Sequence, residues 1–155
     1  GSSSLLLPGR KPVAQAWSSV TSVLEAFRAG IREETSPIQL WPHHFDMTMT
    51  WLPGAKVPGQ DVDNAEYADA QMGFGFTLGD ETITEPYFYV SAYPLPDAFP
   101  TLTLPDGTRW NTTGFQAAVL TYRCLIGSRD PRGYLLDLWR GLLSAGHTYL
   151  ATTTT

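Results

Sequence analysis

Two kinds of hydrophobic periodicity follow one another along this sequence, and their order limits the folds that the chain can adopt. Near each end apolar residues recur every three to four positions, which predicts amphipathic helices over residues 12–35 and 131–150. Between these segments the period is two, as in strands that bury one face. A helix, several strands and a second helix predict an α+β domain in which both helices pack on one face of a sheet.

The alternating segments predict a two-layer sandwich with a mainly antiparallel sheet of about four to five strands. A nearly continuous apolar run is typical of a central strand, and we assign this place to the last long segment. A short additional strand is expected at residues 101–104, before an Asp106-Gly107 turn. The four main strands are expected at residues 44–51, 67–76, 86–93 and 114–126.

The length of 155 residues suits one domain, and no internal repeat or linker divides the sequence. We expect residues 11–151 to form this domain. Residues 1–10 are expected to be a cloning remnant or a disordered N-terminus, and residues 152–155 a disordered tail.

Charge and hydropathy argue against two classes of partner. The formal net charge is −5, and the sequence has no Lys/Arg cluster of the kind that nucleic-acid binding needs. No apolar run approaches the roughly 18 residues needed to span a bilayer.

The only cysteine, Cys124, lies in an apolar segment, where we expect it as a small core residue. A chain with one cysteine and no signal peptide is expected in the cytoplasm.

The polar sides of the predicted strands form the most informative surface. A solvated sheet face is normally rich in Lys, Glu and Arg, whereas this face is rich in Tyr, Thr and Gly. Tyr is enriched where one surface meets another, because it joins a large ring to a hydroxyl group. The residues expected to form this binding face are His44, Asp46, Thr48, Asp69, Gln71, Tyr87 and Tyr89.

The leading hypothesis is therefore a non-enzymatic binding or interaction domain. Its open sheet face would receive a small-molecule ligand, a second subunit in a homo-oligomer, or a missing part of the same protein. In the competing interpretation, the long connection over residues 94–113 folds back and closes this face as a second small core.

The alternative function is a metal-dependent hydrolase. His44 and Asp46 are two residues apart on a predicted strand, so both side chains would lie on one face and could bind a divalent metal. Asp69 or Gln71 on the next strand would supply a third ligand, and Glu85 would act as general base. In the competing interpretation, His44 is a hydrogen-bonded residue that packs against nearby tryptophans, and no cofactor is expected.

Several stretches of the sequence are similar to one family. The most specific is residues 36–46 (SPIQLWPHHFD), and weaker ones begin at Gly73-Phe74-Gly75, at Glu85-Pro86-Tyr87 and at Gly114-Phe115. The chain resembles an uncharacterised bacterial domain-of-unknown-function family, number 5996, which supplies no established activity, cofactor or catalytic residue. Family members look longer, so the resemblance implies that this chain is a C-terminal half and that a partner is the missing N-terminal half.

Overall fold

The part of the chain that the structure describes contains two long α-helices, one short α-helix, one 3-10 helix and seven strands. This is a computed structural model, and it describes residues 10–41, 46–61, 63–64 and 68–150. The helices are α1 (Arg10–Ala29), α2 (Tyr122–Ile126) and α3 (Pro131–Tyr149). The strands are β1 (Glu34–Thr35), β2 (Gln39–Trp41), β3 (Asp46–Leu52), β4 (Gln71–Thr77), β5 (Tyr87–Tyr93), β6 (Thr108–Asn111) and β7 (Ala117–Thr121).

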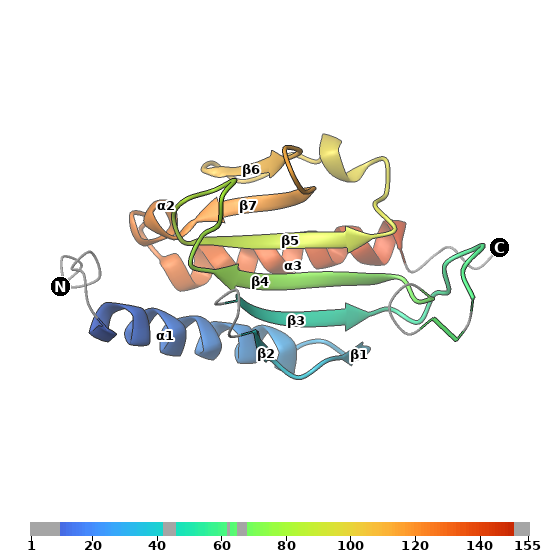
Figure 1. Ribbon diagram of the computed structural model, residues 1–155, viewed down its shortest axis with the longest axis horizontal. Coiled ribbons are helices and arrows are strands. Elements are labelled where there is room, and N and C mark those ends of the chain that lie inside the picture. The colour runs from blue at the N-terminus through green and yellow to red at the C-terminus, as the bar shows by residue number, and fades with distance from the viewer. Residues whose placement is uncertain (1–9, 42–45, 62, 65–67, 151–155) are drawn as a thin grey trace.

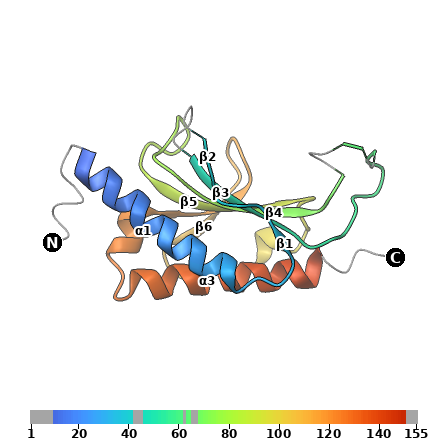
Figure 2. The ribbon, with the colours of Figure 1, turned by 90° about the horizontal axis from the view of Figure 1, so that it is seen from below.

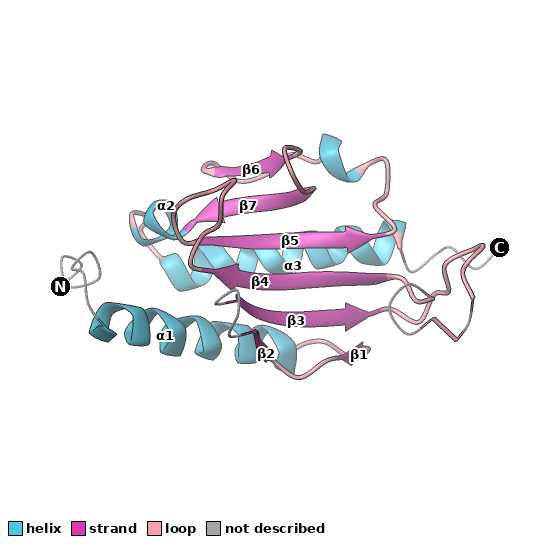
Figure 3. Ribbon diagram, viewed as in Figure 1, coloured by secondary structure: helices cyan, strands magenta, loops and turns pink. Residues whose placement is uncertain are grey.

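All seven strands belong to one antiparallel sheet (Figures 1 and 3). The order across the sheet is β1-β3-β4-β5-β7-β6, and β2 pairs with β3 on the same edge as β1. Because β7 is antiparallel to both of its neighbours, β5 and β6 point in the same direction. The chain therefore passes from β5 to the far edge of the sheet before β7 returns to fill the place between them.

The expected count of four to five strands is wrong, because the described part of the sheet has seven. The three long strands β3, β4 and β5 overlap the predicted segments, although β3 and β4 each end one residue later than predicted. The additional strands β1, β2 and β6 contain two, three and four residues. Strands this short do not complete enough alternations to show a period of two in the sequence.

The predicted strand over residues 114–126 is also wrong in part, because β7 covers only Ala117–Thr121. The Thr121 side chain accepts a hydrogen bond from the backbone N–H of Cys124, at 3.2 Å, and so caps a helix instead of continuing the strand. The apolar residues that follow form α2. Cys124 is exposed and is not the core residue that we expected.

The connection from β5 to β6 lies on the helix side of the sheet and does not close the open face (Figure 2). The strand expected at residues 101–104 does not form: a short 3-10 helix, Phe99–Thr101, ends where it would begin, and Phe99 is buried against Trp110 in the main core. Leu102 and Leu104 also pack against this core. The Asp106-Gly107 turn precedes β6, and Gly107 has a φ of +91°, which favours glycine.

The main core lies between the sheet and the helices, which Figure 2 shows on one side of it. Phe27 of α1 contacts Phe74 of β4, with ring centroids 4.8 Å apart. The same ring lies 5.3 Å from Trp139 of α3, so one phenylalanine joins three elements. Among the described helices, none combines the length and apolar character needed to cross a lipid bilayer.

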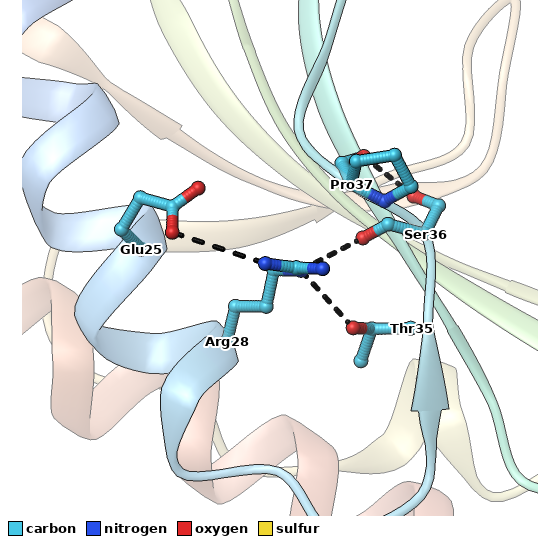
Figure 4. A network of polar contacts seen from close by, with 5 residues as sticks. All are labelled: Glu25, Arg28, Thr35, Ser36 and Pro37. Carbon is cyan, nitrogen blue, oxygen red and sulfur yellow. Dashed lines mark hydrogen bonds and ion pairs between the residues drawn. The ribbon is translucent and has the colours of Figure 1, made fainter.

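Helix α1 ends earlier than the sequence predicts, at Ala29, and a glycine follows it. The next residues leave the helix to form β1, which pairs with the end of β3. Arg28, in the last turn of α1, reaches toward this segment (Figure 4). Its Nε donates to Thr35 Oγ1 at 3.2 Å and to the Ser36 carbonyl at 3.0 Å. These bonds fix the first edge strand to the helix.

Candidate functional site

Tyr89 is the centre of the face that the helices leave uncovered. Its side chain lies across Gly75 on the neighbouring strand, where a Cβ atom would collide with the tyrosine ring. The Tyr89 hydroxyl donates to the Asp46 carboxylate at 2.8 and 2.9 Å and lies 2.8 Å from Thr48 Oγ1. Burial raises the pKa of Tyr89, and the negative charge of Asp46 raises it further, so the hydroxyl stays protonated.

One end of this face is closed by loops of the chain itself. Tyr87 is buried with Ile83 of the β4–β5 loop and Val119 of β7, and Phe115 packs against them. The Tyr87 hydroxyl donates to Asp80 Oδ2 at 2.5 Å. Burial, followed by the hydrogen bond and charge of Asp80, raises the pKa of Tyr87.

Asp80 holds the β4–β5 loop in place. Burial acts to raise the pKa of Asp80, but hydrogen bonds from Tyr87 and from the backbone N–H groups of Ile83 and Thr82 outweigh it. The pKa of Asp80 is therefore lowered overall, which means that these hydrogen bonds stabilise its ionised carboxylate. This end of the face is a small second core and offers little surface to a partner.

The predicted binding-face residues separate into two groups. Asp46, Thr48, Tyr87 and Tyr89 gather around the tyrosine network described above. Asp69 instead forms an ion pair with Lys56, with 2.6 Å between Oδ1 and Nζ. Gln71 lies beside it, and its amide donates to the Asp69 carbonyl at 3.2 Å.

The strand register explains this separation and bears on the metal hypothesis. Asp46 pairs with Thr77, whereas Gln71 lies six residues earlier along β4. At about 3.4 Å per residue, six strand residues span about 20 Å. Neither Gln71 nor the more distant Asp69 can therefore share a metal ion with Asp46.

Two further candidates of the metal hypothesis have different outcomes. His44 lies outside the described residues, so its place as a ligand stays a prediction. Glu85, the proposed general base, forms an ion pair with Arg123, with 2.9 Å between Oε2 and Nη2. Within residues 10–41, 46–61, 63–64 and 68–150, no three His, Cys, Asp or Glu side chains form a group that could hold a metal ion.

On the opposite side of the sheet, α1 and α3 leave a pocket between them. The helices run in the same direction and approach closely at Phe27 and Trp139, while their N-terminal parts diverge (Figures 1 and 2). The space between the diverging parts has a volume of about 580 Å³. We call it the α1–α3 pocket.

Buried apolar side chains form the floor of the α1–α3 pocket. Phe88 contributes from β5, and the Tyr122 ring stacks on it with centroids 6.2 Å apart. Burial raises the pKa of Tyr122, so its hydroxyl is a hydrogen-bond donor at neutral pH. The other buried floor residues are Val20, Val23, Leu125 and Leu135.

Polar side chains form the rim of the α1–α3 pocket. Ser18, Ser19 and Ser22 line one wall from exposed positions on α1. On the other wall, Asp130 caps α3 by accepting a hydrogen bond from the Gly133 N–H at 3.1 Å. The exposed Arg132 follows it, and its guanidinium makes no hydrogen bond or ion pair with any residue that the structure describes. A pocket with an apolar floor and a few polar groups at its rim is typical of small-molecule sites.

Comparison with known proteins gives a family but no function. The model of a family of unknown function (DUF5996) matches residues 11–151. The chain belongs to this family. No curated protein and no solved structure matches the chain. Within the family, the α1–α3 pocket and the tyrosine network must therefore be interpreted from their own chemistry.

The sequence analysis missed the α1–α3 pocket. The signal was present in α1, where residues 18–22 read Ser-Ser-Val-Thr-Ser within a predicted helix. Ser and Thr are weaker helix formers than Ala or Leu, so such a run inside a helix is unusual. The pocket itself depends on how the two helices diverge, which a hydrophobic pattern does not specify.

Proposed function

We propose that this chain is a ligand-binding domain that holds a small organic molecule in the α1–α3 pocket. The observation that carries the proposal is the concave space of about 580 Å³ over an apolar floor. Its volume falls within the range of about 300–1,000 Å³ that small-molecule sites occupy. The aromatic surface of Phe88 and Tyr122 suits a ligand that has a planar or aliphatic apolar part.

The serines of α1 support the same proposal. Three serines face the pocket where alanines would make a more stable helix. Their hydroxyl groups make no hydrogen bond with any described residue, so all three are available to a ligand. Residues that reduce local stability without a structural role are common at binding sites.

The test is to fill the pocket and measure binding. We would record amide NMR shifts of the protein with a panel of naphthalene derivatives and medium-chain alcohols, acids and amines. Ligands should shift amides of residues 18–23 and 122–135, and the shifts should be lost in Ser19→Trp, whose ring would occupy the pocket. Ser144→Trp, at an exposed position of α3 outside the pocket, is the matched control. Binding that survives Ser19→Trp would refute the proposal.

The open sheet face supports a second candidate, an interface with another copy of this chain. The uncovered residues next to Tyr89 include Thr50, Gly73 and Ser91, which are short and carry no charge. An uncharged patch can face its own copy without the repulsion that a net charge of −5 would otherwise cause.

Native mass spectrometry tests this second candidate. A dimer through the sheet face should dissociate in Ser91→Lys and persist in Ser144→Lys. A monomer at micromolar concentration would argue against the interface. The same spectrum of chelator-free protein tests the metal hypothesis, because bound metal should be lost in His44→Ala.

A bacterial origin, a cytoplasmic location and a C-terminal half of a longer protein stay predictions of the sequence.

A further inference from the structure

One exposed arginine lies at the rim of the α1–α3 pocket, on a chain that is acidic as a whole. The formal net charge is −5, yet the segment over residues 122–132 contains three arginines and one aspartate. Arg123 is neutralised by its ion pair with Glu85. Arg132 lines the pocket, and no acidic side chain among the described residues pairs with it.

We propose that the ligand of the α1–α3 pocket is a small organic anion, a carboxylate attached to an apolar body. This inference rests on the proposed ligand-binding function and adds the chemical class of the ligand. The guanidinium of Arg132 would hold the carboxylate, for which its planar donors are suited. The apolar body would lie against the stacked rings of Phe88 and Tyr122.

The hydrogen-bonding groups of the pocket agree with a carboxylate. Four of the residues that line it carry a hydroxyl group, Tyr122 and the three serines of α1, and a hydroxyl group can donate to an anionic oxygen. Tyr122 is protonated at neutral pH, since burial raises its pKa further above the ordinary value of 10, and its hydroxyl group can therefore donate.

Asp130 is the one negative group in the lining, and it would favour a cation instead. Its carboxylate is engaged at the start of α3, where it accepts a hydrogen bond from the Gly133 N–H and interacts with the positive end of the helix dipole. Arg132 has no such partner in the described chain. The balance of available charge therefore favours an anion over an amine.

Three probes of nearly equal shape separate the possibilities: 2-naphthoate, neutral 2-naphthamide and cationic 2-naphthylmethylamine. Their dissociation constants would be measured by isothermal titration at low and high salt. We expect 2-naphthoate to bind about ten-fold more tightly than 2-naphthamide, as one charge-assisted hydrogen bond permits. The amine should bind least tightly. The preference for 2-naphthoate should decrease as salt increases, because the rim is exposed.

Arg132→Gln is the decisive variant, and Arg140→Gln is its matched control. Both positions are exposed on α3 and both changes remove one positive charge, but only Arg132 lines the pocket. Arg132→Gln should abolish the preference for 2-naphthoate over 2-naphthamide and leave the affinity for 2-naphthamide unchanged. Arg140→Gln should preserve the preference. An equal preference in both variants would overturn the inference, because the discrimination would then come from general charge.

The outcomes also separate this inference from the function on which it rests. If all three probes bind equally and Ser19→Trp abolishes their binding, the pocket is a ligand site and the anion inference is wrong. If the amine binds most tightly, Asp130 determines the class and the inference is likewise wrong. If no probe binds and none shifts the pocket amides, the inference and the proposed function fail together.

Discussion

At the scale of single residues, Tyr89 and Gly75 show how the uncovered sheet face is organised. The glycine leaves room for the tyrosine ring, and the ring carries its hydroxyl across β4 to Asp46 and Thr48 on β3. Three strands are thus joined through one side chain. The sequence predicted that these residues share a face, because they alternate with apolar residues. It did not predict the bonds, which depend on strand register.

Removing the Tyr89 hydroxyl should destabilise the sheet. We expect Tyr89→Phe to lower the free energy of unfolding by about 1–3 kcal/mol, the usual effect of losing a hydrogen bond to a charged group. Tyr149→Phe is the control, because Tyr149 is 41% exposed. Urea unfolding followed by circular dichroism measures both changes. Equal stability of the two variants would show that the bond to Asp46 contributes nothing.

Two glycines of α3 should respond in opposite ways to the same substitution. A Cβ atom at Gly141 would meet no atom within 4 Å, so Gly141→Ala should raise the unfolding free energy by about 1 kcal/mol through helix propensity. A Cβ atom at Gly146 would collide with Met72 and lie 2.8 Å from the buried Trp51 ring. Gly146→Ala should therefore lower the unfolding free energy by about 1–3 kcal/mol. Melting temperatures that move in the same direction would contradict this.

At the scale of elements, Glu33 joins the C-terminal parts of β3 and α3, which are far apart in the sequence. Its Oε1 accepts from Trp51 Nε1 at 3.1 Å and lies 2.9 Å from His147 Nε2 on α3. The hydrogen bond with His147, followed by that with Trp51, lowers the pKa of Glu33 from 4.5. A lowered pKa in the folded state means that the ionised carboxylate stabilises the fold.

The pH dependence of stability should therefore change when Glu33 is neutralised. The contribution of Glu33 is fully present above pH 4.5 and is lost as the pH falls through its lowered pKa in the folded state. Since the side chain is 35% exposed, we expect a contribution below about 1 kcal/mol. Wild type should exceed Glu33→Gln in stability at pH 7, and this advantage should decrease progressively as the pH falls below 4.5. The exposed Glu81→Gln is the control, and a pH-independent difference would contradict the assignment.

The sequence predicted the long elements better than the short ones. Strands β3, β4 and β5 each contain seven residues, so an alternating pattern is visible in the sequence. Strand β6 and helix α2 have four and five residues, and their formation depends on neighbours that the local pattern does not reveal. The same reason explains why the α1–α3 pocket was missed, since a pocket is a relation between elements.

At the scale of the whole molecule, the two layers are held together most directly where α1, β4 and α3 meet. Phe27 is 2% exposed and contacts Phe74 and Trp139. On one side of this contact α1 ends, and Glu33 in the segment that follows it reaches His147 of α3; on the other side the two helices diverge around the α1–α3 pocket. The pocket therefore lies on the N-terminal side of the Phe27 contact, over residues 18–23 of α1.

Truncation of this residue should weaken the whole fold. We expect Phe27→Ala to lower the unfolding free energy by about 3–5 kcal/mol, as for large aromatic residues in other cores. Phe115→Ala, on the opposite face of the sheet, should have a smaller effect because Phe115 is only partly buried. Guanidinium unfolding measures both, and a larger loss for Phe115→Ala would place the stabilising centre on the other face.

The order of the strands and of α3 along the chain also has a consequence for folding during synthesis on the ribosome. Strands β3, β4 and β5 can pair with one another as soon as Tyr93 has emerged, because they are consecutive neighbours. Their apolar side then waits for α3, which is completed only at Tyr149. At about 5–20 residues per second this delay is on the order of several seconds, during which α1 can already cover Phe74 but Phe88, which packs against Trp139 of α3, stays exposed to chaperones.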